Sequence, residues 1–271
     1  MSLAPTNKVT SVLFKSLSIL CLVLFSMPLL SCQAGVPVEA KTIQEPPSHA
    51  IWTSLLQEHV QPDGLVDYKG FIKDRQQLNA YLTLLQAGVP DPDTWTKEER
   101  LAYWINAYNA FTVKLIIDNY PLKSIKDLNS TLAIPTVNTI WDQKFFKLGG
   151  AEFSLNMIEH EILRKEFKEP RIHFAINCAS ISCPALLQEA YTAAQLDEQL
   201  EEQTKRFIND PSRNRLGANK LRLSSIFNWF GSDFKRNGTL VEFLNRYSDT
   251  QINPSAPISY LDYNWNLNEQ K

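Results

Sequence analysis

Two cysteines and a histidine lie within one stretch of the chain, RIHFAINCASISCPAL, which covers residues 171–186. They are His173, Cys178 and Cys183. A cysteine thiolate is a nucleophile and a redox-active group, and a neighbouring imidazole can serve as its general base. These residue types at this spacing could support nucleophilic catalysis, disulfide formation or metal binding.

The segment 171–177 follows a proline and predicts a strand, in which side chains alternate between two faces. His173 would then share a face with Asn177 and point away from Cys178, which lies ~16 Å further along an extended chain. The two could meet only if the chain turned sharply. Cys183 is easier to reach, because the residues between the cysteines can loop back.

Cys183 is followed by Pro184, and proline favours the first position of a helix. The next residues, ALLQEA, can continue that helix, which places Cys183 at the N-cap. Backbone N–H groups and the helix dipole would lower the pKa of a thiol there and favour a thiolate. This is the setting that a nucleophilic cysteine needs.

The cysteines also have two less reactive interpretations. Exported together and separated by only four residues, Cys178 and Cys183 could form a small-loop disulfide. The sequence supports metal ligation less strongly, because C-x4-C is not the common C-x2-C spacing of metal and redox sites. We predict no metal site and no cofactor.

Polar residues also interrupt the apolar stretch LAYWINAYNAFTVKLII, residues 101–117, which predicts a buried helix. Asn106 and Asn109 are three residues apart and share a face of that helix. An unsatisfied buried amide costs ~1–3 kcal/mol, so both should be hydrogen-bonded. They either orient a catalytic group or tie a neighbouring loop to the core. His160, on a helix predicted over 155–167, is either a second imidazole of the site or a surface or capping residue.

The other predicted elements surround these residues. A capping box from Thr96 to Glu99 begins the long helix over 101–120, and Thr192 with Gln195 begins another over 192–208. Further helices are predicted over 51–60, 71–87, 225–235 and 240–247, a hairpin over 144–148 and 152–154, a strand over 221–223, and an extended aromatic end over 258–267. The fold class is α+β, a helix-rich single domain with a small, mostly antiparallel sheet.

The N-terminus is typical of a secretory signal. Lys8 and Lys15 precede an apolar run over 16–30, and the small residue Ser31 precedes Cys32. The run is short for a spanning helix of ~20 residues, although an uncleaved anchor is the alternative. The sequence therefore predicts a signal peptide over 1–31, a tether over 32–48 and a globular domain over 49–271.

The end of the signal, Leu-Leu-Ser-Cys32, resembles the bacterial lipobox. The resemblance implies a lipid on Cys32 and an exported protein anchored to the cell envelope, with its domain facing an oxidising periplasm. Gln33 favours the outer membrane in a Gram-negative cell. Of the four cysteines, only Cys178 and Cys183 then remain in the globular domain. The net charge of -2 gives no electrostatic reason to expect nucleic acid as a partner.

Together these segments resemble the bacterial branch of the family called domain of unknown function 547. The matching stretches are GLVDY at 64–68, YWINAYNAF at 103–111, IEH at 158–160 with Leu163 and Arg164, HFAINC at 173–178, SCP at 182–184, SSIF at 224–227 with Trp229, Asp233 and Phe234, and YLDYNW at 260–265. The resemblance implies that Asn106, Asn109, His160, His173, Cys178 and Cys183 occupy motif positions, but it carries no established reaction. Ala179 stands where a glycine is more frequent. The long helix also bears a loose likeness to the core helix of papain- and transglutaminase-like folds, although no cysteine begins it here.

These observations support two main hypotheses. The first is a cysteine-dependent amide hydrolase or acyl transferase acting on an envelope peptide or protein. In it Cys183 is the nucleophile and His173 the base, with Asn106 or Asn109 as orienter or oxyanion donor. The second is a non-catalytic binding or scaffold lipoprotein in which Cys178 and Cys183 form a structural disulfide. A redox role for the pair is a third hypothesis.

Overall fold

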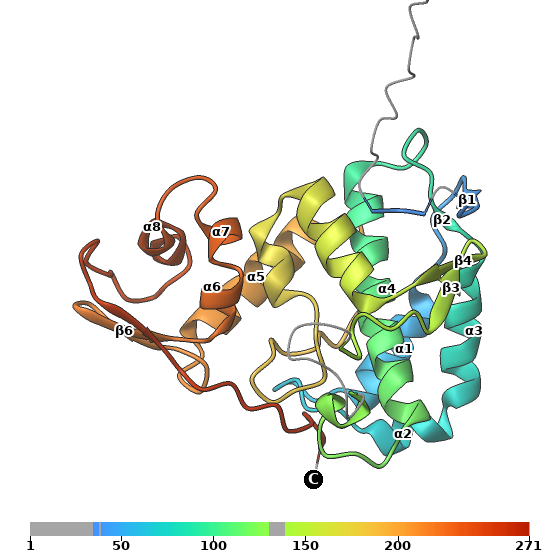
Figure 1. Ribbon diagram of the computed structural model, residues 1–271, viewed down its shortest axis with the longest axis horizontal. Helices are drawn as coiled ribbons and strands as arrows, with labels where there is room; N and C mark the ends of the chain where they lie inside the picture. Colours follow the sequence, from blue (N-terminus) through green and yellow to red (C-terminus); the bar gives the residue numbers. More distant parts are fainter. Residues whose placement is uncertain (1–34, 38, 130–138, 271) are drawn as a thin grey trace, which may run out of the picture. The chain divides into compact units, whose positions relative to one another are not determined.

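The computed structural model describes residues 35–37, 39–129 and 139–270 (Figure 1). The predicted signal peptide and the lipidation site Cys32 lie outside these residues. The folded unit spans Gln33–Lys271 and combines many helices with small sheets, so the prediction of a helix-rich α+β domain is confirmed. Within the described ranges, no helix has the length and apolar character needed to cross a membrane.

The long helix α4, Lys97–Asp118, lies in the larger of two hydrophobic cores. Its predicted capping box is present: the Thr96 hydroxyl accepts the Glu99 N–H at 3.2 Å, and the Glu99 carboxylate accepts the Thr96 N–H at 2.8 Å. The helices that contact α4 include α2, Tyr68–Lys73, α3, Arg75–Gln86, and η2, Met157–Phe167. Most α4 side chains are therefore buried, as its apolar sequence requires.

The other predicted helices form with changed boundaries. Residues 71–87 divide at Asp74 into α2, Tyr68–Lys73, and α3, Arg75–Gln86. Residues 225–235 divide at Phe230 into α6, Ile226–Trp229, and α7, Gly231–Phe234. The helices α1, Ala50–His59, α5, Leu196–Asn209, and α8, Leu240–Asn245, lie close to their predicted ranges. The short helix η1, Ile125–Leu128, was not predicted. α5 begins after Gln195 without a side-chain cap, so the predicted Thr192 start was wrong.

The strands form three small sheets. β3, Phe146–Leu148, and β4, Ala151–Phe153, form the predicted hairpin. β1, Thr42–Ile43, pairs in parallel with β2, Val89–Pro90. β5, Arg215–Gly217, pairs antiparallel with β6, Lys220–Leu223, and β6 pairs in parallel with β7, Ile258–Tyr260. β1 lies within residues 32–48, for which a tether is predicted, so this part of the stretch is paired with the domain.

The second core is rich in phenylalanine. It gathers side chains from α5, β6, α6, α7 and α8, including Phe207, Phe227, Phe234 and Phe243. Phe174 lies in this core, whereas its neighbour Ile172 belongs to the first. The short segment that contains both residues therefore packs against both cores.

That segment is a 3-10 helix, η3, Pro170–Phe174, so the predicted strand over 171–177 is wrong. Pro170 stands in its first turn, and the Glu169 carboxylate caps it by accepting the Arg171 N–H at 3.0 Å. Its consecutive residues Ile172, His173 and Phe174 are all buried. With cores on both sides, the segment does not need the two-faced alternation of a strand.

Candidate functional site around Cys178 and Cys183

The two cysteines meet in space. Their Sγ atoms are not bonded and lie 2.7 Å apart, and the Cys178 N–H donates to Cys183 Sγ at 2.9 Å. This separation is only ~0.7 Å longer than a disulfide bond of ~2.05 Å. Cys183 is 4% exposed, whereas Cys178 is partly exposed. The pair is therefore placed for sulfur–sulfur chemistry, and Cys178 is the more exposed of the two residues.

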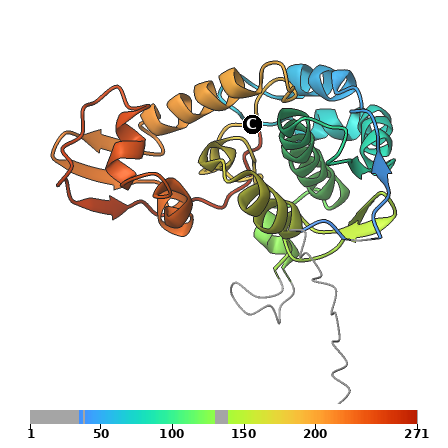
Figure 2. The same cartoon turned by 90° about the horizontal axis from the view of Figure 1, so that it is seen from above.

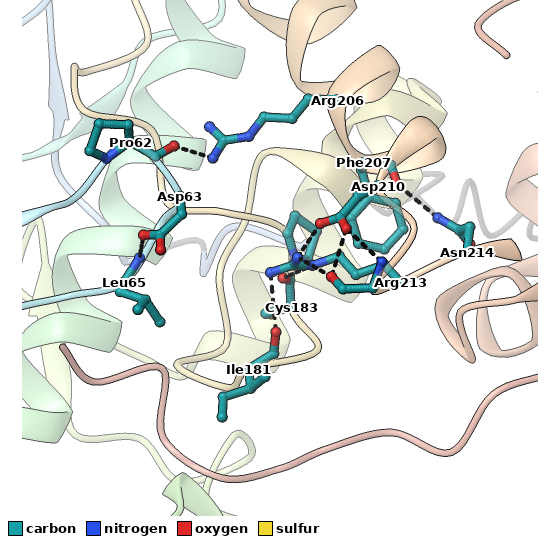
Figure 3. A network of polar contacts seen from close by, with 12 residues as sticks. Pro62, Asp63, Leu65, Ile181, Cys183, Arg206, Phe207, Asp210, Arg213 and Asn214 are labelled. Carbon is teal, nitrogen blue, oxygen red and sulfur yellow. Dashed lines mark hydrogen bonds and ion pairs between the residues drawn. The ribbon is translucent and has the colours of Figure 1, made fainter. Parts of the chain in front are cut away.

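Arg213 holds the loop that carries Cys183 (Figure 3). Its Nε donates to the Cys183 carbonyl at 2.9 Å and its Nη2 to the Ile181 carbonyl at 3.1 Å. An ion pair with Asp210 fixes the guanidinium itself. Residues 184–190 form no regular helix, and the Pro184 carbonyl instead accepts the Asn177 side chain at 2.7 Å. The prediction of a helix N-cap at Cys183 was wrong. The carbonyls of Cys183 and Pro184 accept hydrogen bonds from the side chains of Arg213 and Asn177, and not from the N–H groups of a helix.

Asn106 and Asn109 both bind backbone. The Asn106 carboxamide donates to the Tyr191 carbonyl at 2.8 Å and accepts the Tyr191 N–H at 2.9 Å. The Asn109 carboxamide donates to the Ala175 carbonyl at 3.0 Å and accepts the Asn177 N–H at 2.8 Å. Each side chain therefore ties a loop to α4, and Asn109 fixes the chain immediately before the cysteines.

Two hydroxyl groups surround Cys178. Tyr263 Oη lies 3.3 Å and Ser180 Oγ 3.4 Å from Cys178 Sγ, and the two hydroxyls are 3.1 Å apart. Neither residue was predicted as part of the site. The signal for Tyr263 was its place in the aromatic motif YLDYNW, and Ser180 lies between the cysteines in the sequence.

These contacts shift the pKa values of the two cysteines in opposite directions. Burial opposes ionisation of Cys183, but hydrogen bonds from the Cys178 thiol, the Tyr263 hydroxyl and the Cys178 N–H outweigh it and lower the pKa of Cys183. The same thiol–thiolate hydrogen bond, together with burial and the charge of Cys183, raises the pKa of Cys178. Cys183 is therefore the cysteine that ionises first, for local reasons and not because of a helix dipole.

Glu159 is a further titratable group that the prediction missed. It lies on η2 with 8% exposure, and its carboxylate is 3.5 Å from the Tyr108 hydroxyl. Burial raises the pKa of Glu159 to about 7. A carboxyl group with such a pKa can exchange protons near neutral pH. Its neighbour His160 was the residue singled out from the sequence.

His173 belongs to a different group of side chains. Its Nε2 is 2.9 Å from Asp233 Oδ2, and its ring stacks on Phe230 with centroids 4.0 Å apart. Burial lowers the pKa of His173 to about 4, although Asp233 opposes this. Within the described ranges, His173 makes no hydrogen bond to either cysteine. The geometry therefore does not assemble the predicted pairing of His173 with Cys183.

His160 joins the same group as His173. Its Nδ1 is 3.1 Å from Arg164 Nη1, and Arg164 Nε donates to Asp233 at 2.6 Å. Burial opposes ionisation of Asp233, but His173 and Arg164 hold the pKa of Asp233 well below its usual value. Both imidazoles are thus organised around Asp233, while the thiols are organised around Tyr263 and Ser180.

Comparison with known proteins adds one finding. Residues 92–208 match the family model "Protein of unknown function, DUF547". No match was found among the curated proteins or the solved structures. The match supports the family resemblance over this part of the chain, and the lipoprotein-type branch stays a prediction. The loose likeness of α4 to papain- and transglutaminase-like helices also stays a prediction.

The DUF547 segment contains α4, η2, η3 and both cysteines. Arg213, Asp233 and Tyr263 lie outside it. The side chains that hold the Cys183 loop and contact Cys178 therefore come partly from the C-terminal part of the chain. The candidate site thus consists of the DUF547 segment together with this part.

One group outside the DUF547 segment has ligand types suited to a metal ion. Glu58, His59 and Asp74 present side-chain ligand atoms within 4.8 Å of one another. His59 Nε2 is already 2.8 Å from Asp74 Oδ2, and Glu58 is exposed. This is an ordinary histidine–carboxylate contact with an acidic neighbour, and the expectation of no metal site stays a prediction.

Proposed function

We propose that Cys178 and Cys183 carry out thiol–disulfide exchange with a thiol-bearing partner. The observation that carries this proposal is the 2.7 Å separation of the two sulfur atoms, which belong to one partly exposed and one buried residue. A partner would approach Cys178 more easily, whereas the buried Cys183 can reach only its neighbour. Cys178 would therefore form the mixed disulfide with the partner, and Cys183 would be the leaving group.

The reaction proceeds from the disulfide form. A partner thiolate attacks Cys178 Sγ, the Cys178–Cys183 bond breaks, and its electron pair stays on Cys183 as a thiolate. A second partner thiolate then attacks the partner sulfur of the mixed disulfide and releases Cys178, which takes up a proton. The partner leaves with a disulfide, and the protein holds a thiol and a thiolate. The reverse sequence transfers a disulfide from a partner to the protein.

The surroundings of the pair support this role over a purely structural one. Of the groups that lower the pKa of Cys183, the Tyr263 hydroxyl and the Cys178 N–H are still present when Cys178 is in the mixed disulfide. They make Cys183 a better leaving group, because a stabilised thiolate leaves faster. A stabilised thiolate also favours the reduced form and makes the disulfide more reactive.

The test compares two single variants exposed to glutathione disulfide. Cys183→Ser should form a stable mixed disulfide at Cys178, because no second thiol resolves it. Cys178→Ser should react much more slowly, because Cys183 is buried. Alkylation and intact mass report both products, and the native protein should equilibrate reversibly across glutathione redox buffers.

A Cys178–Cys183 disulfide that resists mild reductant would instead support the binding or scaffold alternative, in which the bond is structural. Equal reactivity of the two serine variants would also contradict the proposal. Native thiols that remain free in an oxidising buffer would count against every function that depends on a disulfide.

The predicted amide hydrolase or acyl transferase is the second candidate. The observation in its favour is the lowered pKa of Cys183, since the thiolate is the nucleophilic form of a cysteine. Without His173, proton transfer would fall to Glu159. A hydrolase requires Cys183 and tolerates loss of Cys178, whereas exchange requires both. Cys178→Ala and Cys183→Ala, assayed with an activated amide or ester, separate the two functions.

We also propose that the protein is exported and anchored to the bacterial cell envelope through lipid on Cys32. The lipobox-like sequence supports this, and the outer membrane is favoured by Gln33. An oxidising periplasm would keep an exchanging pair supplied with disulfides. Membrane fractionation of the native protein and of Cys32→Ala, with mass analysis of the N-terminus, tests the anchor.

A further inference from the structure

The outer edge of the β5–β6–β7 sheet carries main-chain groups that face away from the sheet. β7 lies at this edge, in dark red in Figure 1 and Figure 2. The Leu221 N–H donates to the Pro257 carbonyl at 3.0 Å, and the Leu261 N–H donates to the Leu223 carbonyl at 2.8 Å. Residues 257, 259 and 261 therefore turn their main chain toward β6, and Ile258 and Tyr260 turn theirs outward.

β7 is exposed along its whole length. Ile258 is 36% and Tyr260 39% exposed, and both rank among the few large apolar side chains exposed in the described part of the chain. An edge strand with open N–H and C=O groups is a template for another strand. Apolar side chains on such an edge favour pairing, whereas lysine or proline would discourage it.

The chain that follows β7 passes close to the two cysteines. Tyr263 is three residues after Tyr260, ~10 Å along an extended chain, and its hydroxyl is 3.3 Å from Cys178 Sγ. The Tyr263 ring packs against Trp229, with centroids 4.8 Å apart, and against Trp265 at 4.5 Å. Trp229 is 46% exposed. A partly exposed aromatic cluster of Trp229, Tyr263 and Trp265 therefore lies between the outer edge of β7 and Cys178.

We propose that the partner in thiol exchange is an extended polypeptide that pairs with β7 as an added strand and presents its own cysteine to Cys178. Only another backbone offers N–H and C=O groups at the spacing that Ile258 and Tyr260 require. The rings of Trp229 and Tyr263 would take an apolar side chain next to the reacting cysteine. This inference rests on the proposed exchange function and names its substrate class.

The test uses the oxidised protein and two probes, glutathione and an unstructured peptide of about ten residues with one cysteine near an end. Docking raises the effective concentration of the peptide thiol, so the peptide should react at least ~10-fold faster than glutathione after correction for thiol pKa. Tyr260→Pro removes the outward N–H and leaves the β6 ladder intact. It should slow the peptide to the glutathione rate and leave the glutathione rate unchanged.

Tyr260→Ala is the matched control. It removes the ring but keeps the N–H, so the peptide should still react with it several-fold faster than glutathione does. If Tyr260→Pro does not fold, peptides N-methylated at alternate positions can be used with the native protein, because they lack the backbone donors. These peptides should react no faster than glutathione.

Two results would overturn the inference while sparing exchange itself: a peptide no faster than glutathione, or equal losses in Tyr260→Pro and Tyr260→Ala. A disulfide that reacts with neither probe would overturn the inference and the proposed function together. The glutathione rate therefore separates the two failures.

Discussion

Glu159 is a carboxyl group inside the protein, and its protonation should be visible in the stability of the fold. Because its folded pKa of about 7 is raised above the ordinary value of 4.5, ionisation costs the native state free energy as pH rises from 4.5 to 7. Glu159→Gln should therefore increase the free energy of unfolding by on the order of 3 kcal/mol above pH 7, and by little below pH 4.5. Urea unfolding at a series of pH values measures this.

The control for this prediction is Glu161→Gln on the same helix. The Glu161 side chain is 44% exposed and pairs only with Lys165. Its replacement should change the stability by a few tenths of a kcal/mol at any pH. A Glu159→Gln variant that behaves like Glu161→Gln would show that the Glu159 carboxylate is well solvated.

The backbone at Ala179 gives a second prediction for a single residue. A glycine has no Cβ and adopts a φ of 58° without strain, so Ala179→Gly should leave the free energy of unfolding unchanged or raise it by up to ~1 kcal/mol. Ala110, equally buried but inside α4, is the matched comparison. Ala110→Gly should lower the free energy of unfolding by about 1 kcal/mol. Similar losses for both variants in chemical denaturation would contradict this account.

At the scale of elements, α4 is the scaffold that holds the cysteine segment through Asn109. Asn109→Ala would leave the Ala175 carbonyl and the Asn177 N–H buried without their partner. Each unpaired group costs ~1–3 kcal/mol, so the variant should lose about 2–6 kcal/mol of stability. It should also alter the reactivity of Cys178, because the chain before it is released. Denaturant unfolding and the rate of thiol alkylation measure the two effects.

Thr112→Val is the control on the same helix. Its hydroxyl donates at 2.8 Å to the Tyr108 carbonyl, a contact within α4 that positions no loop. The variant should lose less stability than Asn109→Ala and leave Cys178 reactivity unchanged. If both variants changed the reactivity equally, α4 as a whole and not Asn109 would hold the segment.

At the scale of the molecule, two histidines make the whole fold sensitive to acid. Burial lowers the pKa of both His49 and His173 to about 4, below the ordinary value of 6.5. The unfolded chain binds more protons than the native one between these values, so stability should fall as pH decreases from 6.5 to 4. Glu159 contributes with the opposite sign, and Glu159→Gln should steepen the dependence. A stability that is constant over this range would contradict the neutral state of both histidines.

Local signals in the sequence determined several elements of this protein. The Thr96–Glu99 capping box and the apolar run after it specify α4, and Gly149 and Gly150, with positive φ values, specify the turn between β3 and β4. Each signal depends on residues a few positions apart, whose interactions form in any context. The DUF547 resemblance likewise follows from the order of motifs along the chain, and the family match over residues 92–208 supports it.

Tertiary structure decided the site. His173 pairs with Asp233, 60 residues away, and not with a cysteine, while Cys178 contacts Tyr263, 85 residues away. A short apolar run such as IHFAI cannot by itself distinguish a strand from a helical turn. Packing against two cores selected the 3-10 helix, and backbone carbonyls bound by Arg213 and Asn177 replaced the predicted helix after Cys183. The sequence could name the reactive residues, but only long-range packing determined their partners, because burial and hydrogen bonding depend on distant segments.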